Sequence, residues 1–313
     1  MKRLSWLAGH IVLASFLILA PARSAFGGGP LYVAGASYFD PSVKGHPLVW
    51  ANGNVFYYTD PGDLSPILPH AAADALVLDA AVHWLLVPNI RLSIRPAGQL
   101  AEDVNGTNVT IAGGVLSLPA DIQPSAVATP VGIVYDFDGQ VTETLLGTNS
   151  SLDCLNNAVY GGLDNFNTNA TFAHALVILN GLCAQDPSQL FDFEYRLIRV
   201  LGHVLGLGSS QANLNVWTGS PAPTAEDFAG FPVMHSFDPP YCLPITNCLP
   251  NADQPKMDDR IALARLYPSG AFPNTAIQGR VLFPAAAGEP PLDRACRVST
   301  SWRDELIRRR CSR

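Results

Sequence analysis

The chain has 313 residues, of which 48% are hydrophobic and 14% charged, so it can bury a sizeable core and is neither a disordered nor a coiled-coil chain. Its net charge of −7 is unevenly distributed. Residues 294–313 are rich in arginine and carry a net charge of +5, so residues 1–293 carry −12. So acidic a body argues against nucleic acid as the partner.

Residues 1–27 predict a secretory signal peptide. Lys2 and Arg3 give a positive start, and residues 6–20 form an apolar run that is short for a membrane span. The alternative is that this segment is not cleaved and anchors the protein in a membrane. We expect a secreted protein, extracellular or periplasmic, with no membrane segment after cleavage at one of three positions: Ser24, Ala25 or Gly27.

Six cysteines in an exported chain favour disulfides over metal thiolates. Sequence order favours Cys154 with Cys183 and Cys242 with Cys248, although six cysteines allow fifteen pairings. Cys296 and Cys311 lie in the basic tail.

Residues 54–58 predict a strand, which the turn at residues 60–62 ends. Ser65 and Pro66 then predict the start of a helix that runs to about Val87. Its expected buried face is spaced at helical intervals: Ile67, Ala71, Ala75, Leu78, Val82 and Leu85. Short strands are expected at 91–94, 109–111, 131–135 and 173–179.

A second helix is expected over residues 189–207, followed by a long loop and a last helix over 254–266. This order of elements predicts an α+β fold. Residues 276–283 resemble the first strand of a separate β-module that does not continue. We therefore hypothesise that the coding sequence is truncated or frame-shifted near Pro290, with residues 271–290 as the start of that module and 291–313 as a basic tail.

The second helix carries the most informative pattern. His203 and Gly206 lie in the stretch Gly202–Gly208, Met234 follows in Pro-Val-Met-His, and 258–268 form the last helix. Together these features resemble the metzincin zinc proteases, and within them the matrixin branch, over about residues 50–268. We assign 28–49 to a lead-in and 50–270 to a matrixin-like domain. The resemblance implies a mixed, mostly parallel twisted sheet with two long helices, a Met-turn at Met234 and a C-terminal helix.

In that family three histidines bind zinc and a glutamate acts as general base. Here Arg199 stands at the first ligand position, Val200 at the general-base position and Ser209 at the third ligand position. Arginine offers zinc no lone pair and valine cannot take a proton, so only His203 of the expected metal ligands remains. We expect a proteolytically inactive pseudoenzyme.

Two alternatives stay open, namely an active zinc metalloendopeptidase with an unusual ligand set and a secreted structural or interaction module. If family geometry is kept, Arg199, His203 and Ser209 converge in a cleft that could bind a peptide or a carboxylate. A solvated polar stripe with an Asp192–Arg196 ion pair is the simpler interpretation of this helix face: Asp192, Arg196, Arg199 and His203.

Further metal candidates are weaker. His174 lies on a strand that in matrixins carries a structural zinc ligand, but an ordinary strand histidine is the favoured interpretation. Calcium is possible in the loops 103–106, 136–139 and 164–169, where tight turns explain the same residues. His235 lies beside the Met-turn. No serine-nucleophile, phosphate-loop or dinucleotide motif is present in the sequence.

Overall fold

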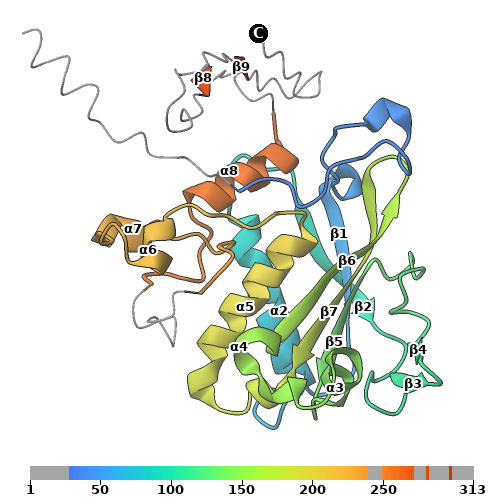
Figure 1. Ribbon diagram of the computed structural model, residues 1–313. Helices are drawn as coiled ribbons and strands as arrows, with labels where there is room; N and C mark the ends of the chain where they lie inside the picture. The colour runs from blue at the N-terminus through green and yellow to red at the C-terminus, as the bar shows by residue number, and fades with distance from the viewer. Residues whose placement is uncertain (1–27, 239–248, 271–279, 282–295, 298–313) are drawn as a thin grey trace, which may run out of the picture.

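The computed structural model describes residues 28–238, 249–270, 280–281 and 296–297 (Figure 1). Five strands form one sheet in the order β2-β1-β5-β7-β6, in which β6 alone runs antiparallel to its neighbour. The predicted α+β class with a mostly parallel sheet is therefore confirmed. The strands of this sheet are β1 (Asn54–Thr59), β2 (Ser93–Gln99), β5 (Val131–Asp136), β6 (Val159–Asn167) and β7 (Thr171–Asn180).

Three helices carry most of the helical structure: α2 (His70–Leu85), α5 (Leu190–Val204) and α8 (Met257–Leu266). The shorter elements are η1 (Pro41–Val43), η2 (Ala51–Gly53), the hairpin β3 (Thr110–Ala112) and β4 (Val115–Ser117), α3 (Gln140–Leu146), η3 (Ser150–Leu152), α4 (Cys154–Asn157), η4 (Gly181–Cys183), η5 (Pro187–Gln189), α6 (Leu214–Thr218) and α7 (Ala225–Ala229).

The sheet is buried on both faces. Figure 1 shows α2 and α5 side by side along one face, where Trp84 and Leu197 lie in the main hydrophobic core. A smaller core, which includes Val134 and Ile178, lies under α3 and the segment 100–122. The mostly apolar character of β5 and β7 follows from this double burial.

The first predicted helix begins later than expected. Ser65 and Leu68 pair with each other in a turn, Ser65 Oγ donates to the Ala184 carbonyl, and α2 starts only at His70 after Pro69. Its predicted buried face is also wrong, because Ala71, Ala75 and Leu78 are exposed. Alanines and other apolar residues of this helix lie on all of its sides, so their spacing alone did not identify the buried face. That face consists of Ala73, Val77, Ala80, Ala81 and Trp84.

Strand β6 was not predicted. Its Gly161 and Gly162 adopt φ of 119° and 156°, and an added Cβ at Gly161 would lie 2.1 Å from the Leu176 carbonyl oxygen. Glycine is therefore required there by close approach to β7, yet it weakens the strand signal in the sequence.

Aromatic donors hold the C-terminal end of α5. Trp50 Nε1 donates to the Val204 carbonyl at 2.8 Å, and the Tyr267 hydroxyl donates to the Leu205 carbonyl at 2.9 Å. Helix ends leave carbonyls without intrahelical partners, so these bonds fix where α5 stops relative to β1 and α8.

The predicted Cys154–Cys183 disulfide is present and joins α4 to η4. Cys242 and Cys248 lie outside the described residues, as do residues 1–27 and most of 271–313. Of that last region the structure describes two short strands, β8 (Arg280–Val281) and β9 (Cys296–Arg297), which pair antiparallel.

Candidate functional site

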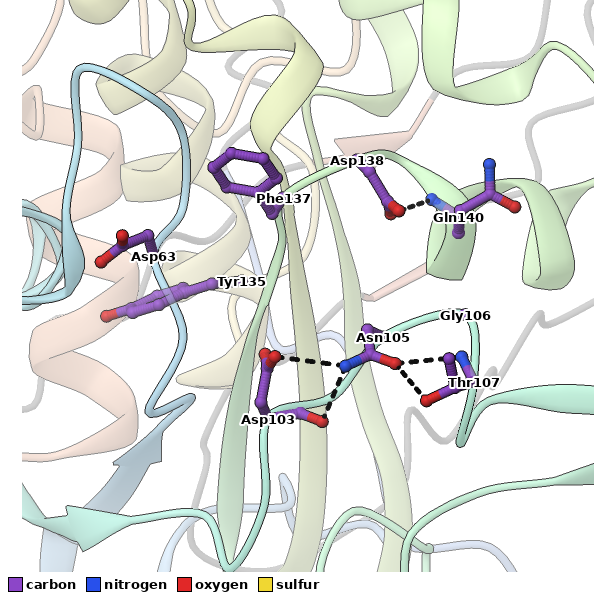
Figure 2. A pocket seen from close by; sticks show the side chains of 9 residues that line it. All are labelled: Asp63, Asp103, Asn105, Gly106, Thr107, Tyr135, Phe137, Asp138 and Gln140. Carbon is purple, nitrogen blue, oxygen red and sulfur yellow. Dashed lines mark hydrogen bonds between the residues drawn. The ribbon is translucent and has the colours of Figure 1, made fainter.

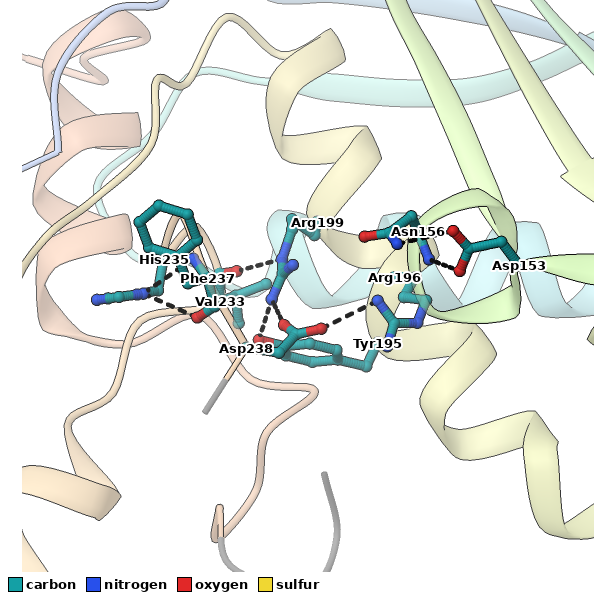
Figure 3. Close-up of polar contacts among 9 residues, drawn as sticks. All are labelled: Asp153, Asn156, Tyr195, Arg196, Arg199, Val233, His235, Phe237 and Asp238. Atoms are coloured by element: carbon teal, nitrogen blue, oxygen red, sulfur yellow. Dashed lines mark hydrogen bonds and ion pairs between the residues drawn. The ribbon is translucent and has the colours of Figure 1, made fainter. Parts of the chain in front are cut away.

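Arg199 lies on the α5 face that meets the loop after residue 230 (Figure 3). Its Nε donates to the Val233 carbonyl at 3.1 Å, and Nη2 donates to the Tyr195 hydroxyl at 2.6 Å. Nη2 also donates to a carboxylate oxygen of Asp238. Only 16% of the Arg199 side chain is exposed, so its charge is largely desolvated and depends on this partner.

Asp238 joins two arginines of α5. Its second oxygen accepts from Arg196 Nη1 at 3.0 Å, and its side chain is 11% exposed. Burial acts to raise the pKa of Asp238, but the charges of Arg199 and Arg196 outweigh burial and hold the pKa below its usual value. The carboxylate is therefore ionised wherever the protein is folded near neutral pH.

The predicted solvated stripe on α5 is wrong for its arginines, since Arg196 is buried and Arg199 nearly so. The hypothesis that Arg199 is available to bind the carboxylate of a ligand is wrong too, because the carboxylate that Arg199 binds belongs to Asp238 of the same chain. Sequence reasoning missed Asp238, whose only signal was its place four residues after Met234.

His203 lies one turn after Arg199. Its Nδ1 lies 2.9 Å from the Leu207 carbonyl oxygen, which can only accept, so Nδ1 carries the proton and Nε2 keeps a lone pair. Burial, helped by the Arg199 charge, lowers the pKa of His203. A neutral imidazole with a free Nε2 retains the electronic form of a metal ligand.

The chain turns sharply after His203. Gly206 has φ of 89°, and the Leu207 N–H donates to the Gly202 carbonyl at 3.0 Å. Ser209 follows in an exposed position, and among the described residues no hydrogen bond joins it to Arg199 or His203. Val200 is buried in the core beside α2. The three ligand positions named from the sequence therefore give one imidazole, one engaged cation and one exposed hydroxyl, and the general-base position gives a buried apolar side chain.

Met234 packs directly beneath α5. A Cβ added to Gly202 would lie 2.3 Å from Met234 Sδ and 2.7 Å from the Trp84 ring. The Asp259 carboxylate of α8 accepts from the N–H groups of Val233 and Met234 at 2.9 and 3.2 Å, which fixes this turn from the other side.

His235 follows the turn and is buried. Its ring lies 4.3 Å from that of Phe231, centroid to centroid, and its Nδ1 lies beside the Phe237 backbone. Burial lowers its pKa, so we expect a neutral ring that packs the loop.

Two of the predicted calcium loops meet in a pocket of about 610 Å³ at the C-terminal ends of β1 and β5 (Figure 2). Their side chains already make turn hydrogen bonds: Asn105 Oδ1 accepts from Thr107 Oγ1 at 2.6 Å, and Asp138 from the Gln140 N–H at 3.1 Å. Asp136 accepts from Val141 and Thr142 at the start of α3. These bonds explain the residues as turns and a helix cap, and calcium at this pocket stays a prediction.

His174 of β7 is fully buried, and its Nδ1 lies 2.6 Å from Asp164 of β6. Asp164 belongs to the third predicted calcium loop, so that loop supplies a partner for a strand histidine. The Nε2 of His174 is buried without a hydrogen-bond partner.

One constellation was missed by sequence reasoning. Asp79 and His83 of α2 lie beside Glu194 of α5, with one potential ligand atom from each residue within 4.8 Å of the others. Burial, followed by repulsion from Asp79 and Asp253, raises the pKa of Glu194 to about 7. The Asp-x-x-x-His spacing on one helix was the available signal, because residues four apart lie on the same helix face.

Comparison with protein-family models and with curated proteins finds no match. Within the described residues, no helix is both long and apolar enough to cross a bilayer.

Proposed function

We propose that this protein is an exported, matrixin-like pseudopeptidase that does not hydrolyse peptides and in which a buried ion pair takes the place of the family's zinc centre. The observation that carries the proposal is the position of Arg199, which is fully engaged by Val233, Tyr195 and Asp238 where the first zinc ligand would be. The ion pair ties α5 to the loop around Met234 without a metal.

The surrounding framework supports this assignment. The resemblance implies a mostly parallel sheet with two long helices and a methionine turn. The chain has such a sheet and two such helices, together with a sharp turn at Gly206 and Met234 packed under α5. The Asp259 carboxylate belongs to α8, the C-terminal helix, and it fixes the Met234 turn by accepting from the Met234 N–H.

Zinc does not fit the residues at this centre. A catalytic zinc site needs three protein ligands with lone pairs. Arg199 is a permanent cation, Val200 has no proton acceptor and Ser209 points into solvent without a contact to His203 in the described structure. We derive no hydrolytic step through a metal here.

Peptide binding at the outer edge of the sheet is the role that we propose. In the described part of the sheet, β6 is an outer strand that pairs with β7 on one side, and α5 packs close to it. The free edge of an outer strand offers backbone N–H and C=O groups to an extended peptide. A working zinc peptidase is the second candidate, favoured by the lone pair on His203 Nε2.

Restoring the family's residues tests the proposal. The variant with Arg199→His, Val200→Glu and Ser209→His together should gain hydrolysis of casein when zinc is supplied, because the framework and the peptide cleft are then intact. The matched control, Arg199→His and Ser209→His without Val200→Glu, should bind zinc and remain inactive for lack of a general base. Casein hydrolysis by the unmodified protein would contradict the proposal.

A further inference from the structure

Three ligand-type side chains converge where α2 packs against α5, and a fourth, Asp253, lies beside one of them. Asp79 and His83 stand one turn apart on α2, and Glu194 reaches them from the first half of α5. Asp253 joins from the segment that precedes α8. Three separate parts of the chain therefore meet at one point.

The distances suit a small cation. His83 Nε2 lies 4.0 Å from Glu194 Oε1 and 3.8 Å from Asp253 Oδ2. Ligands about 2.1 Å from a tetrahedral ion lie about 3.4 Å apart, so these two separations would shorten by about half an ångström. The same distances are too long for hydrogen bonds, so His83 does not satisfy either carboxylate by hydrogen bonding.

Glu194 supplies an independent observation. Among the described residues its Oε1 has no hydrogen-bond partner and is inaccessible to solvent, although the side chain is 19% exposed and also makes a hydrogen bond with Asp79. A buried carboxylate oxygen without a donor is costly, and the neighbouring Asp79 and Asp253 add negative charge. Lys256 interacts electrostatically with Asp253, but its ammonium donates its hydrogen bonds to the carbonyls of Pro250 and Asn251.

We propose that Asp79, His83 and Glu194, together with Asp253, form a binding site for a divalent transition-metal ion of the zinc type that ties α2 to α5. An imidazole among carboxylates favours zinc over calcium or magnesium, which prefer all-oxygen sites. A cation there gives Glu194 Oε1 its missing partner and neutralises the acidic cluster. The role is structural, because the ion joins two core helices and the α8 lead-in.

This proposed metal site is separate from His203 and the residues around it on α5. Glu194 and His203 are nine residues apart on α5, which corresponds to about 13 Å along the helix axis. Zinc bound through His83 and zinc bound through His203 can therefore be told apart by substitution, and the outcome at one site does not decide the other.

The test is titration of the metal-free, disulfide-oxidised protein with Zn²⁺, by calorimetry and by metal analysis after dialysis. We expect one Zn²⁺ per chain and a higher melting temperature with zinc. His83→Gln and Glu194→Gln should each weaken binding by at least about tenfold, the loss that even outer-shell partners of a metal cause. Millimolar Ca²⁺ should not compete.

His70→Gln is the matched control. His70 lies on the same helix and also pairs with an aspartate one turn away, Asp74, at 3.2 Å, but it is outside the cluster. Zinc affinity should be unchanged in this variant and in His203→Ala. In the unmodified protein, zinc should shift the ring resonances of His83 and leave those of His70 in place, a readout that needs no variant to fold. Absence of zinc binding, or binding that survives both His83→Gln and Glu194→Gln, would overturn the proposal.

Discussion

The carboxylate of Asp238 accepts hydrogen bonds from Arg199 through one oxygen and from Arg196 through the other, so one acid pairs with two arginines of α5 (Figure 3). The acid comes from the loop after Met234, and the arginines come from the helix. The pair therefore fixes the helix and the loop relative to each other without a metal.

Asp238→Asn should destabilise the protein by about 3–5 kcal/mol, because it leaves two largely buried guanidinium groups without a counter-charge. Arg199→Met should cost less, about 1–3 kcal/mol, since Asp238 keeps Arg196 as a partner. Urea unfolding of both variants and of the double variant measures the coupling. The exposed Arg260→Met serves as control, and equal losses for Asp238→Asn and this control would contradict the assigned role.

Stability should depend on pH through Asp259. Burial, opposed by three backbone donors, raises the pKa of this carboxyl to about 6. A carboxyl with a raised pKa in the folded state contributes stability that is complete below the unfolded pKa and is lost as pH rises through the folded pKa. From about pH 4 to about pH 6 the free energy of unfolding should therefore fall by about 2–3 kcal/mol on account of this group.

The measurement for Asp259 is urea unfolding across that range for the unmodified protein and Asp259→Asn. The variant should lack this part of the pH dependence. Identical pH profiles for the two proteins would show that Asp259 does not titrate there.

Gly202→Ala should destabilise the helix contact by about 1–3 kcal/mol through overpacking, which exceeds the gain in helix propensity. The new methyl group would meet Met234 Sδ and the Trp84 ring. Gly29→Ala is the control, because nothing lies within 4 Å of its added Cβ. Thermal unfolding compares them, and a more stable Gly202→Ala protein would refute the close packing of Met234.

Opening the Cys154–Cys183 disulfide should cost about 2–4 kcal/mol, since the closed loop spans a sequence separation of 29 residues. Replacing both cysteines with alanine, followed by urea unfolding, measures the loss. A variant as stable as the oxidised protein would mean that the disulfide does not reduce the conformational entropy of the unfolded chain.

The sequence predicted the class of the fold because apolar runs such as β5 and β7 are unambiguous when both faces of a sheet are buried. It did not predict β6, whose glycines serve a close backbone approach, nor the packed face of α2, where alanines surround the helix. The family resemblance singled out Arg199, His203 and Met234, and their roles at a site stay predictions. Asp238 and the cluster around Glu194 depend on contacts between distant segments, which spacing within one helix does not reveal.

The central proposal is that His203 does not bind a catalytic zinc. The most direct measurement compares the unmodified protein with His203→Ala, both loaded with zinc and then dialysed, for zinc content and for hydrolysis of casein. We predict equal zinc content in the two proteins and hydrolysis in neither. Zinc that is lost with His203→Ala, together with a casein-hydrolysing activity that disappears in the same variant, would contradict the account.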